Sequence, residues 1–257
     1  MGTSTWHRSP ATPEWDRVRE LYGRPHPDPR EVVRRIVAAL DPETREHMKA
    51  PAVVTCLGVL LEGSRLVSEM GMINALASLG VGSEPAAVQM AAGLRGRAEG
   101  LIAAAEQASR FGDLALEAVG TTAMAIATLH DAGAGLLGVP LSVAEANFAG
   151  FHREGRHAEL AGSFLRHDLD RAFRHFISRD LADFIGGEGV PTVGHASRLE
   201  DAAARVCRED LVGLDLARWR GEVAQAASAP PRVWPAMLGP ALSAGMDAAL
   251  DVLGGAG

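Results

Sequence analysis

Along most of this chain, apolar residues recur at the three- and four-residue spacing of amphipathic helices, and the alternating pattern of strands is almost absent. Helix start signals recur as well. Thr12, Asp28 and Asp41 each stand directly before a proline, where a side-chain oxygen can cap a helix whose first residue is Pro. Ser142 and Ser197 each have a glutamate three residues later, which is the capping-box pattern. The pattern therefore predicts an all-α protein.

The predicted fold is a multi-helix bundle of about ten helices. Their ranges are 13–22, 30–40, 42–50, 52–79, 85–110, 114–131, 143–154, 157–185, 197–227 and 236–253. We expect a break near Gly63 or Gly71 in the fourth helix and at Gly213 in the ninth. We expect one helical domain, 1–257, which can be subdivided into N-terminal helices (1–50), an apolar bundle (51–150) and a charged helical half (151–257).

The helix predicted for 157–185, here called the hub helix, carries four of the chain's seven phenylalanines. Its apolar residues form one stripe along the helix: Leu165, Leu169, Phe173, Phe176, Ile177 and Phe184. Asp180 falls in the centre of that stripe. A carboxylate buried there needs a cationic partner or a raised pKa. We therefore expect Asp180 to be shielded and paired, or to act as an acid or base in a pocket.

The polar side of the hub helix carries His167 and Arg171, with His175 at its edge. Imidazole and guanidinium groups on one face can meet a ligand or a partner, although such a face can equally be solvated and held by local ion pairs. Together with Asp180, these three residues form the candidate catalytic set.

His152, Glu154 and His157 form the candidate metal-ligating set. The spacing from Glu154 to His157 places a carboxylate and an imidazole on one helical face, as in carboxylate-bridged di-iron bundles. Those bundles use two such pairs and two further glutamates, whereas this chain has one pair. The sequence therefore favours a site for a single metal ion over a di-iron site, and it identifies no cofactor.

A short stretch with His130 and Asp131, Thr128-Leu-His-Asp-Ala-Gly133, resembles the signature of HD-type phosphohydrolases, in which His and Asp on one helix bind a metal. The likeness covers about a dozen residues. No histidine lies between His47 and His130 to supply the upstream ligand. The activity of that family is therefore not carried over to this chain.

Charge and composition exclude several classes of site. The chain has 25 basic and 32 acidic residues, and no region is strongly basic, so we expect no nucleic-acid partner. Lys49 is the only lysine, which leaves no phosphate-binding loop of the Walker type. Cys56 and Cys207 are too few for a cysteine-rich zinc site. The apolar runs are shorter than a membrane span, and we see no signal peptide, so we expect a cytoplasmic protein without a membrane span.

No complete catalytic constellation can be assembled from these residues, whereas the predicted helices have broad apolar faces. The leading hypothesis is therefore a non-enzymatic interaction or scaffold protein that binds a protein partner or self-associates into an oligomer. One alternative is an enzyme or metal-binding protein with a His/carboxylate site in 130–180. The other is a carrier of an apolar small molecule, lined by 51–148.

Overall fold

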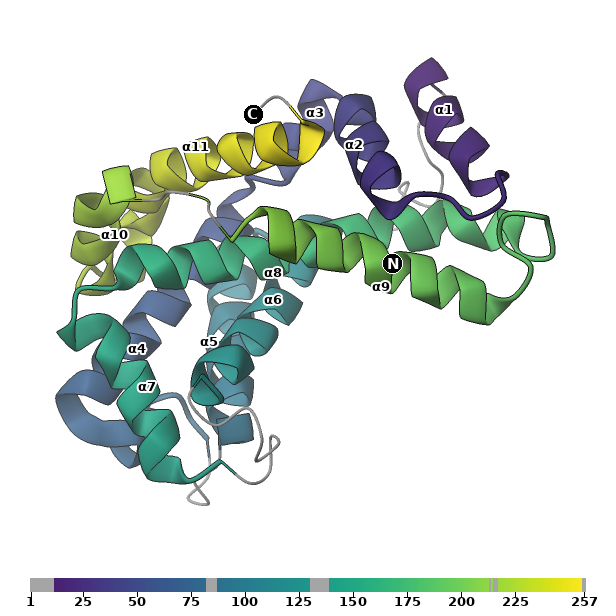
Figure 1. Ribbon diagram of the computed structural model, residues 1–257. Helices are drawn as coiled ribbons and strands as arrows, with labels where there is room; N and C mark the ends of the chain where they lie inside the picture. The colour runs from purple at the N-terminus through teal and green to yellow at the C-terminus, as the bar shows by residue number, and fades with distance from the viewer. Residues whose placement is uncertain (1–11, 82–86, 130–138, 213, 215–216, 256–257) are drawn as a thin grey trace. The chain divides into compact units, whose positions relative to one another are not determined.

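The chain folds into α-helices (Figure 1), as the sequence predicts. The computed structural model describes residues 12–81, 87–129, 139–212, 214 and 217–255. The α-helices of these residues are α1 (Pro13–Tyr22), α2 (Pro29–Ala39), α3 (Pro42–His47), α4 (Pro51–Ser78), α5 (Ala87–Ala104), α6 (Arg110–Ala127), α7 (Leu141–Arg153), α8 (His157–Leu181), α9 (Val193–Asp210), α10 (Arg220–Ala227) and α11 (Trp234–Gly254). Short 3-10 helices are η1 (Ala182–Phe184), η2 (Ala217–Trp219) and η3 (Pro231–Val233).

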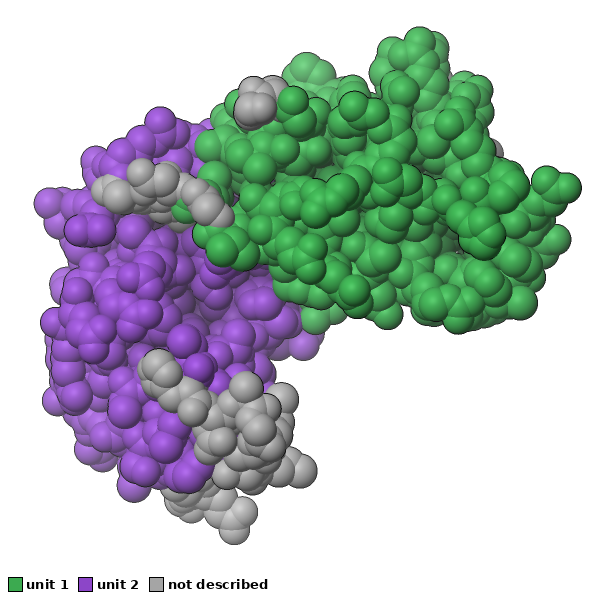
Figure 2. Space-filling view, viewed as in Figure 1, with its two compact units in different colours: residues 1–45, 169–214, 247–257 green, residues 46–168, 215–246 purple. Residues whose placement is uncertain are grey.

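The helices divide into two compact units, coloured separately in Figure 2. Unit 1 consists of residues 1–45, 169–214 and 247–257, and unit 2 of residues 46–168 and 215–246. The hub helix, α8, supplies its first half to unit 2 and its second half to unit 1. Each unit therefore combines segments that are distant in the sequence. The expectation of one domain with three sub-ranges stays a prediction.

The predicted Pro-associated caps are confirmed at three helix starts. The backbone N–H of Trp15 donates to Thr12 Oγ1 at 3.3 Å, and that of Arg30 donates to Asp28 Oδ1 at 3.0 Å. At α3, Thr44 donates to Asp41 in the same way, at 2.6 Å. In each case a side-chain oxygen satisfies a backbone donor that has no partner within the helix.

Both predicted capping boxes are wrong. Helix α7 begins at Leu141, before Ser142, and the carboxylate of Glu145 accepts instead from the backbone N–H of Met72 at 2.9 Å. Met72 follows Gly71, whose φ of 78° and ψ of 164° interrupt α4. The break predicted near Gly63 or Gly71 is therefore at Gly71, and Glu145 satisfies a donor that the break leaves without its helical acceptor.

The predicted helix 197–227 is wrong at its start, and its residues form two helices, α9 and α10. Helix α9 begins at Val193 rather than at Ser197, since Thr192 Oγ1 accepts from the backbone N–H of His195 at 3.3 Å. The break expected at Gly213 lies outside the described residues, as does the HD-like stretch from His130 onward. The hub helix ends at Leu181.

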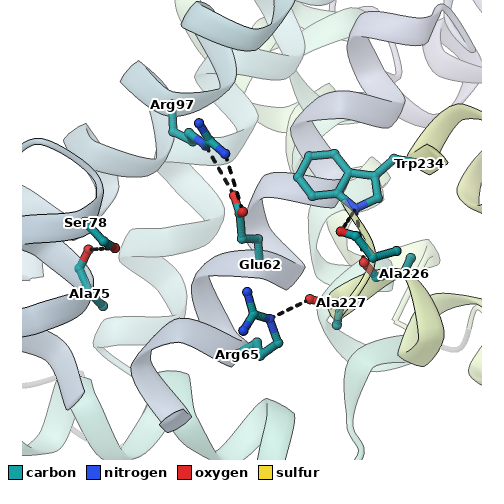
Figure 3. A network of polar contacts seen from close by, with 9 residues as sticks. Glu62, Arg65, Ala75, Ser78, Arg97, Ala226, Ala227 and Trp234 are labelled. Atoms are coloured by element: carbon teal, nitrogen blue, oxygen red, sulfur yellow. Dashed lines mark hydrogen bonds and ion pairs between the residues drawn. The ribbon is translucent and has the colours of Figure 1, made fainter. Parts of the chain in front are cut away.

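Unit 2 is organised around α4, whose first two turns are almost wholly buried. The buried Ser64 donates its hydroxyl proton to the carbonyl of Phe148 in α7 at 2.9 Å. Towards α5, Glu62 accepts from Arg97 at 3.3 Å (Figure 3). Apolar packing and a few directed polar contacts thus fix the neighbours of α4.

The corner between α10 and α11 is also held against α4. The buried indole of Trp234 donates from Nε1 to the carbonyls of Ala226 and Ala229, each at 3.1 Å (Figure 3). Arg65 of α4 donates to the carbonyl of Ala227 at 2.9 Å. A β-carbon built on Gly58 of α4 would lie only 2.3 Å from a ring carbon of Trp234, so the absence of a side chain there is what admits the indole.

Two helical stretches are long and apolar enough to cross a membrane: Pro42–Ser78, with a mean hydropathy of 1.5, and Pro231–Gly254, with a mean hydropathy of 1.2. Within the protein, 72% of the first window and 44% of the second are buried. Core helices have the same length and composition, so the two stretches are weak evidence for a membrane span. The expectations of no span and of a cytoplasmic location stay predictions.

Unit 1 packs α1 and α2 with α9 and the second half of α8. The ring centroids of Trp15 and Phe176 lie 5.9 Å apart, and those of Tyr22 and Phe184 lie 5.6 Å apart. Between α8 and α9, Arg174 donates to Asp201 at 2.8 Å. Aromatic contacts from the hub helix and from η1 thus hold α1 in place, as the density of phenylalanine in 157–185 suggests.

Two glycine-to-alanine changes should alter the free energy of unfolding in opposite directions, because a side chain at Gly58 would meet Trp234 and one at Gly120 would meet nothing. Gly58→Ala forces a methyl group against the indole and should lower the free energy of unfolding by about 1–3 kcal/mol. Gly120→Ala, in α6, meets nothing within 4 Å and should raise it by up to about 1 kcal/mol, because alanine favours a helix. Urea denaturation of both variants checks the prediction, and equal effects would contradict it.

Candidate functional site

The predicted catalytic set lies along α8, but its members do not face one direction. His167, Arg171 and His175 are four residues apart, so they follow one side of the helix, and all three are half-buried. Asp180 lies about 140° round the helix from His175 and is buried. His167 belongs to unit 2 and the other three to unit 1. The set therefore divides into a polar row and a buried carboxylate, and a catalytic role for any of them stays a prediction.

The expected burial and pairing of Asp180 are confirmed. Its side chain is 3% exposed, and its Oδ1 accepts from Arg179 Nε at 3.2 Å. The guanidinium of Arg179 lies over the rings of Trp15 and Phe176, at 4.8 and 5.8 Å from their centroids. From α1, Arg19 Nε stands 4.0 Å from the second carboxylate oxygen. The carboxylate of Asp180 and the guanidinium of Arg179 are thus buried together, with the guanidinium over two aromatic rings.

Tyr22 of α1 is buried near this pair, and its backbone contacts Gly189. Burial and the nearby charge of Asp180 raise the pKa of the Tyr22 phenol well above its usual value. The carbonyl oxygen of Tyr22 lies 2.1 Å from where a β-carbon of Gly189 would stand, and that of Arg24 lies 2.5 Å away. The backbone at Gly189 therefore rests directly on the segment that follows α1, and only glycine fits there.

A cavity of about 210 Å³ opens beside this contact. Three of its lining side chains are basic or imidazole groups: His26, from the Pro-rich segment between α1 and α2, and His195 and Arg198 from α9. The other lining residues are Pro27, Pro29, Gly189, Val190, Leu199 and Ala202. We call this cavity the cationic pocket. Among the described residues, no carboxylate contributes to its lining.

The first turn of α9 adds to the positive character of the cationic pocket. His195 Nδ1 lies 2.8 Å from Thr192 Oγ1, the cap of the helix. The guanidinium of Arg198 folds back toward the start of the helix, where its Nη1 is 3.8 Å from the position of a β-carbon on Gly194. Backbone N–H groups in a first helical turn carry partial positive charge. Positive groups therefore gather here with no acid in the cavity wall.

The candidate metal set is brought together only in part. His152 Nδ1 and His157 Nε2 lie 3.1 Å apart across the turn between α7 and α8. Burial and the neighbouring His152 lower the pKa of His157. Glu154 is exposed and pairs with Arg156 at 3.3 Å. The described residues hold no group of three His, Cys, Asp or Glu side chains placed to share a metal ion.

Asp168 is a buried acid that the sequence analysis did not single out. It lies in the unit 2 part of α8, and burial raises its carboxyl pKa to about 8. The residues of the cationic pocket were missed as well. His26 comes from one segment and His195 and Arg198 from another, so no local spacing relates them.

Comparisons of the chain with protein-family models, with curated proteins and with solved structures found no significant match. The sites of this protein are therefore judged by their own chemistry.

The buried pair in unit 1 predicts a large effect for Asp180→Asn. Removal of one charge leaves Arg179 buried without its anion, which should lower the free energy of unfolding by about 3–5 kcal/mol. Asp183→Asn, at an exposed position just beyond α8, should change it by no more than about 0.5 kcal/mol. Thermal and urea denaturation measure both changes. An Asp180→Asn variant as stable as Asp183→Asn would show that the pair is not held in the core.

The raised pKa of Asp168 predicts a stability that falls as pH rises. In the unfolded chain this carboxyl ionises near its ordinary pKa of 3.8, whereas in the folded chain it stays protonated up to about pH 8. Between those values the folded state binds the additional proton, so higher pH favours unfolding by up to about 1.4 kcal/mol per pH unit. Asp168→Asn removes this dependence. Its gain in stability over the wild type should therefore grow between pH 5 and pH 8 in urea denaturation, and parallel curves would refute the assignment.

Proposed function

We propose that this protein is a non-enzymatic binding protein, and that the cationic pocket of unit 1 binds a small anionic ligand. One observation carries the proposal: His26, His195 and Arg198 converge on one cavity whose lining contains no acid, in a chain with a net charge of −7. Electrostatic complementarity then favours an anion. The proposal keeps the non-enzymatic part of the sequence-based hypothesis, but it replaces the protein partner with a small anionic ligand and assigns that ligand to one cavity.

The surroundings of Arg198 support this reading. Seven arginines of unit 1 have a carboxylate oxygen within 4.0 Å: Arg19, Arg30, Arg34, Arg35, Arg174, Arg179 and Arg208. Arg198 has no such partner among the described residues, like Arg17, Arg24 and Arg205, but it differs from those three in lining the cavity. Its head group instead lies near the first turn of α9, where an unneutralised cation is electrostatically unfavourable. A bound anion would remove that cost.

The walls of the cationic pocket are also fixed in advance of binding. His26 has a φ of 51°, in the left-handed region that non-glycine residues seldom adopt. Gly189 is held against the carbonyls of Tyr22 and Arg24. Strained backbone of this kind persists when the surroundings fix it, and it is concentrated at binding sites. A cavity with preset walls loses less conformational entropy when a ligand binds.

The proposal predicts that Arg198 is required for anion binding. Acetate and inorganic phosphate, titrated separately and followed by NMR, should shift the backbone amides of Val190, His195 and Leu199. Arg198→Ala should weaken binding about tenfold or more, because a hydrogen bond to a charged group contributes roughly 1.5–3 kcal/mol.

Arg205→Ala is the matched control. Arg205 is exposed on the same helix and does not line the cationic pocket, so the variant loses the same charge without touching the cavity. Equal losses in the two variants would indicate a general charge effect. Shifts that avoid the pocket, or no shifts at all, would overturn the proposed function.

A further inference from the structure

We infer that the ligand of the cationic pocket is a compact monocarboxylate with an apolar tail of a few carbons. This inference rests on the proposed function and deepens it, because it identifies the chemical class of the anion. Three features of the cavity lead to it: the number of permanent charges, the apolar wall and the size.

The charges in the lining match a single negative charge. Of the described residues that line the cavity, only Arg198 has a side chain that is always ionised, since the other two basic groups, His26 and His195, are imidazoles. A planar guanidinium presents a fork of N–H donors that fits the two oxygens of a carboxylate. The described part of the lining has no lysine and no hydroxyl or amide side chain to meet the further oxygens of a dianionic phosphate. The cation and its donors therefore fit a carboxylate best.

The remaining wall of the cavity is apolar. Pro27, which precedes α2, and Pro29, the first residue of α2, supply one part. Val190, Leu199 and Ala202 supply the rest. Val190 is 1% exposed and Leu199 is 7% exposed, so both belong to the packed body of unit 1. A ligand held by its carboxylate at Arg198 places its other atoms against these side chains, where burial of methylene groups is favourable.

The size of the cavity limits the length of that tail. About 210 Å³ holds roughly seven water-sized groups at about 30 Å³ each. A carboxylate takes up part of that space, so roughly four or five carbons remain. At Gly189 the cavity wall is backbone packed against the carbonyls of Tyr22 and Arg24, so no side chain can move aside there to enlarge the cavity. Longer tails have to project into solvent.

The test is a series of linear carboxylates titrated into the full chain by calorimetry or NMR: acetate, butyrate, hexanoate and octanoate, with inorganic phosphate alongside. Affinity should rise about fourfold for each added methylene up to about hexanoate and then level off. Hexanoate should also bind more tightly than phosphate. No variant is needed for this part, so the result does not depend on how a mutant folds.

Two variants test whether the carbon tail of the ligand lies against the apolar wall of the cavity. Ala202→Leu fills part of the wall from a half-buried helical position, and it should abolish the rise with chain length while acetate still binds. Ser197→Leu is the matched control, because it adds the same side chain at an exposed position of α9 outside the cavity lining. It should retain the rise.

The outcomes separate this inference from the proposed function. Carboxylates that bind equally whatever their length, or phosphate that binds more tightly than hexanoate, would overturn the inference and leave anion binding intact. A rise with chain length that Ala202→Leu does not reduce would also overturn it, since the tail would then lie elsewhere. Absence of binding by every anion would overturn both.

Discussion

Unit 1 depends on one buried ion pair, in which the guanidinium of Arg179 lies over the ring of Trp15 and reaches the carboxylate of Asp180. Both residues lie on α8, so α1 does not form the pair. The docking of α1 covers the pair with the indole of Trp15 and brings Arg19 Nε to 4.0 Å from the carboxylate of Asp180, which offsets part of the cost of burying the charges. The same docking places the carbonyl of Tyr22 against Gly189, one of the residues that line the cationic pocket. Packing in the interior in this way positions one part of the wall of the exposed cavity.

The hub helix carries three buried aspartates, and each is accommodated by different means. Asp180 has its aromatic-lined ion pair, whereas Asp170 accepts from both Arg174 and Arg208, at 3.4 and 3.0 Å. Asp168 is kept neutral by burial. Three buried aspartates are thus stabilised in three ways: by a cation in the core, by an ion pair with a neighbouring helix, and by protonation of the carboxyl group. Burial of an acid alone therefore does not identify a catalytic residue in this protein.

Local signals in the sequence predicted the Pro-associated helix caps, but not the capping boxes. Thr12, Asp28 and Asp41 were recognisable because the cap and the helix it caps are adjacent in the chain. The signal at Ser142 failed because the pattern cannot show that its glutamate is needed at Gly71, on another helix. The position of Asp180 in the apolar stripe predicted its burial. It did not predict the second nearby cation, Arg19, which comes from α1. The residues of the cationic pocket come from segments with no common spacing, and only folding brings them together.

The division of the chain into interleaved segments also has a consequence for synthesis. Unit 1 joins residues near the start of the sequence to residues far along it, as in the contact of Arg30 with Asp210 across 180 positions. Closing such a large loop costs entropy before any contact forms, and contacts of this kind slow folding. A ribosome releases α1 and α2 long before α8 and α9. The first two helices therefore emerge without the surfaces they pack on, and unit 1 assembles only when most of the chain has been made.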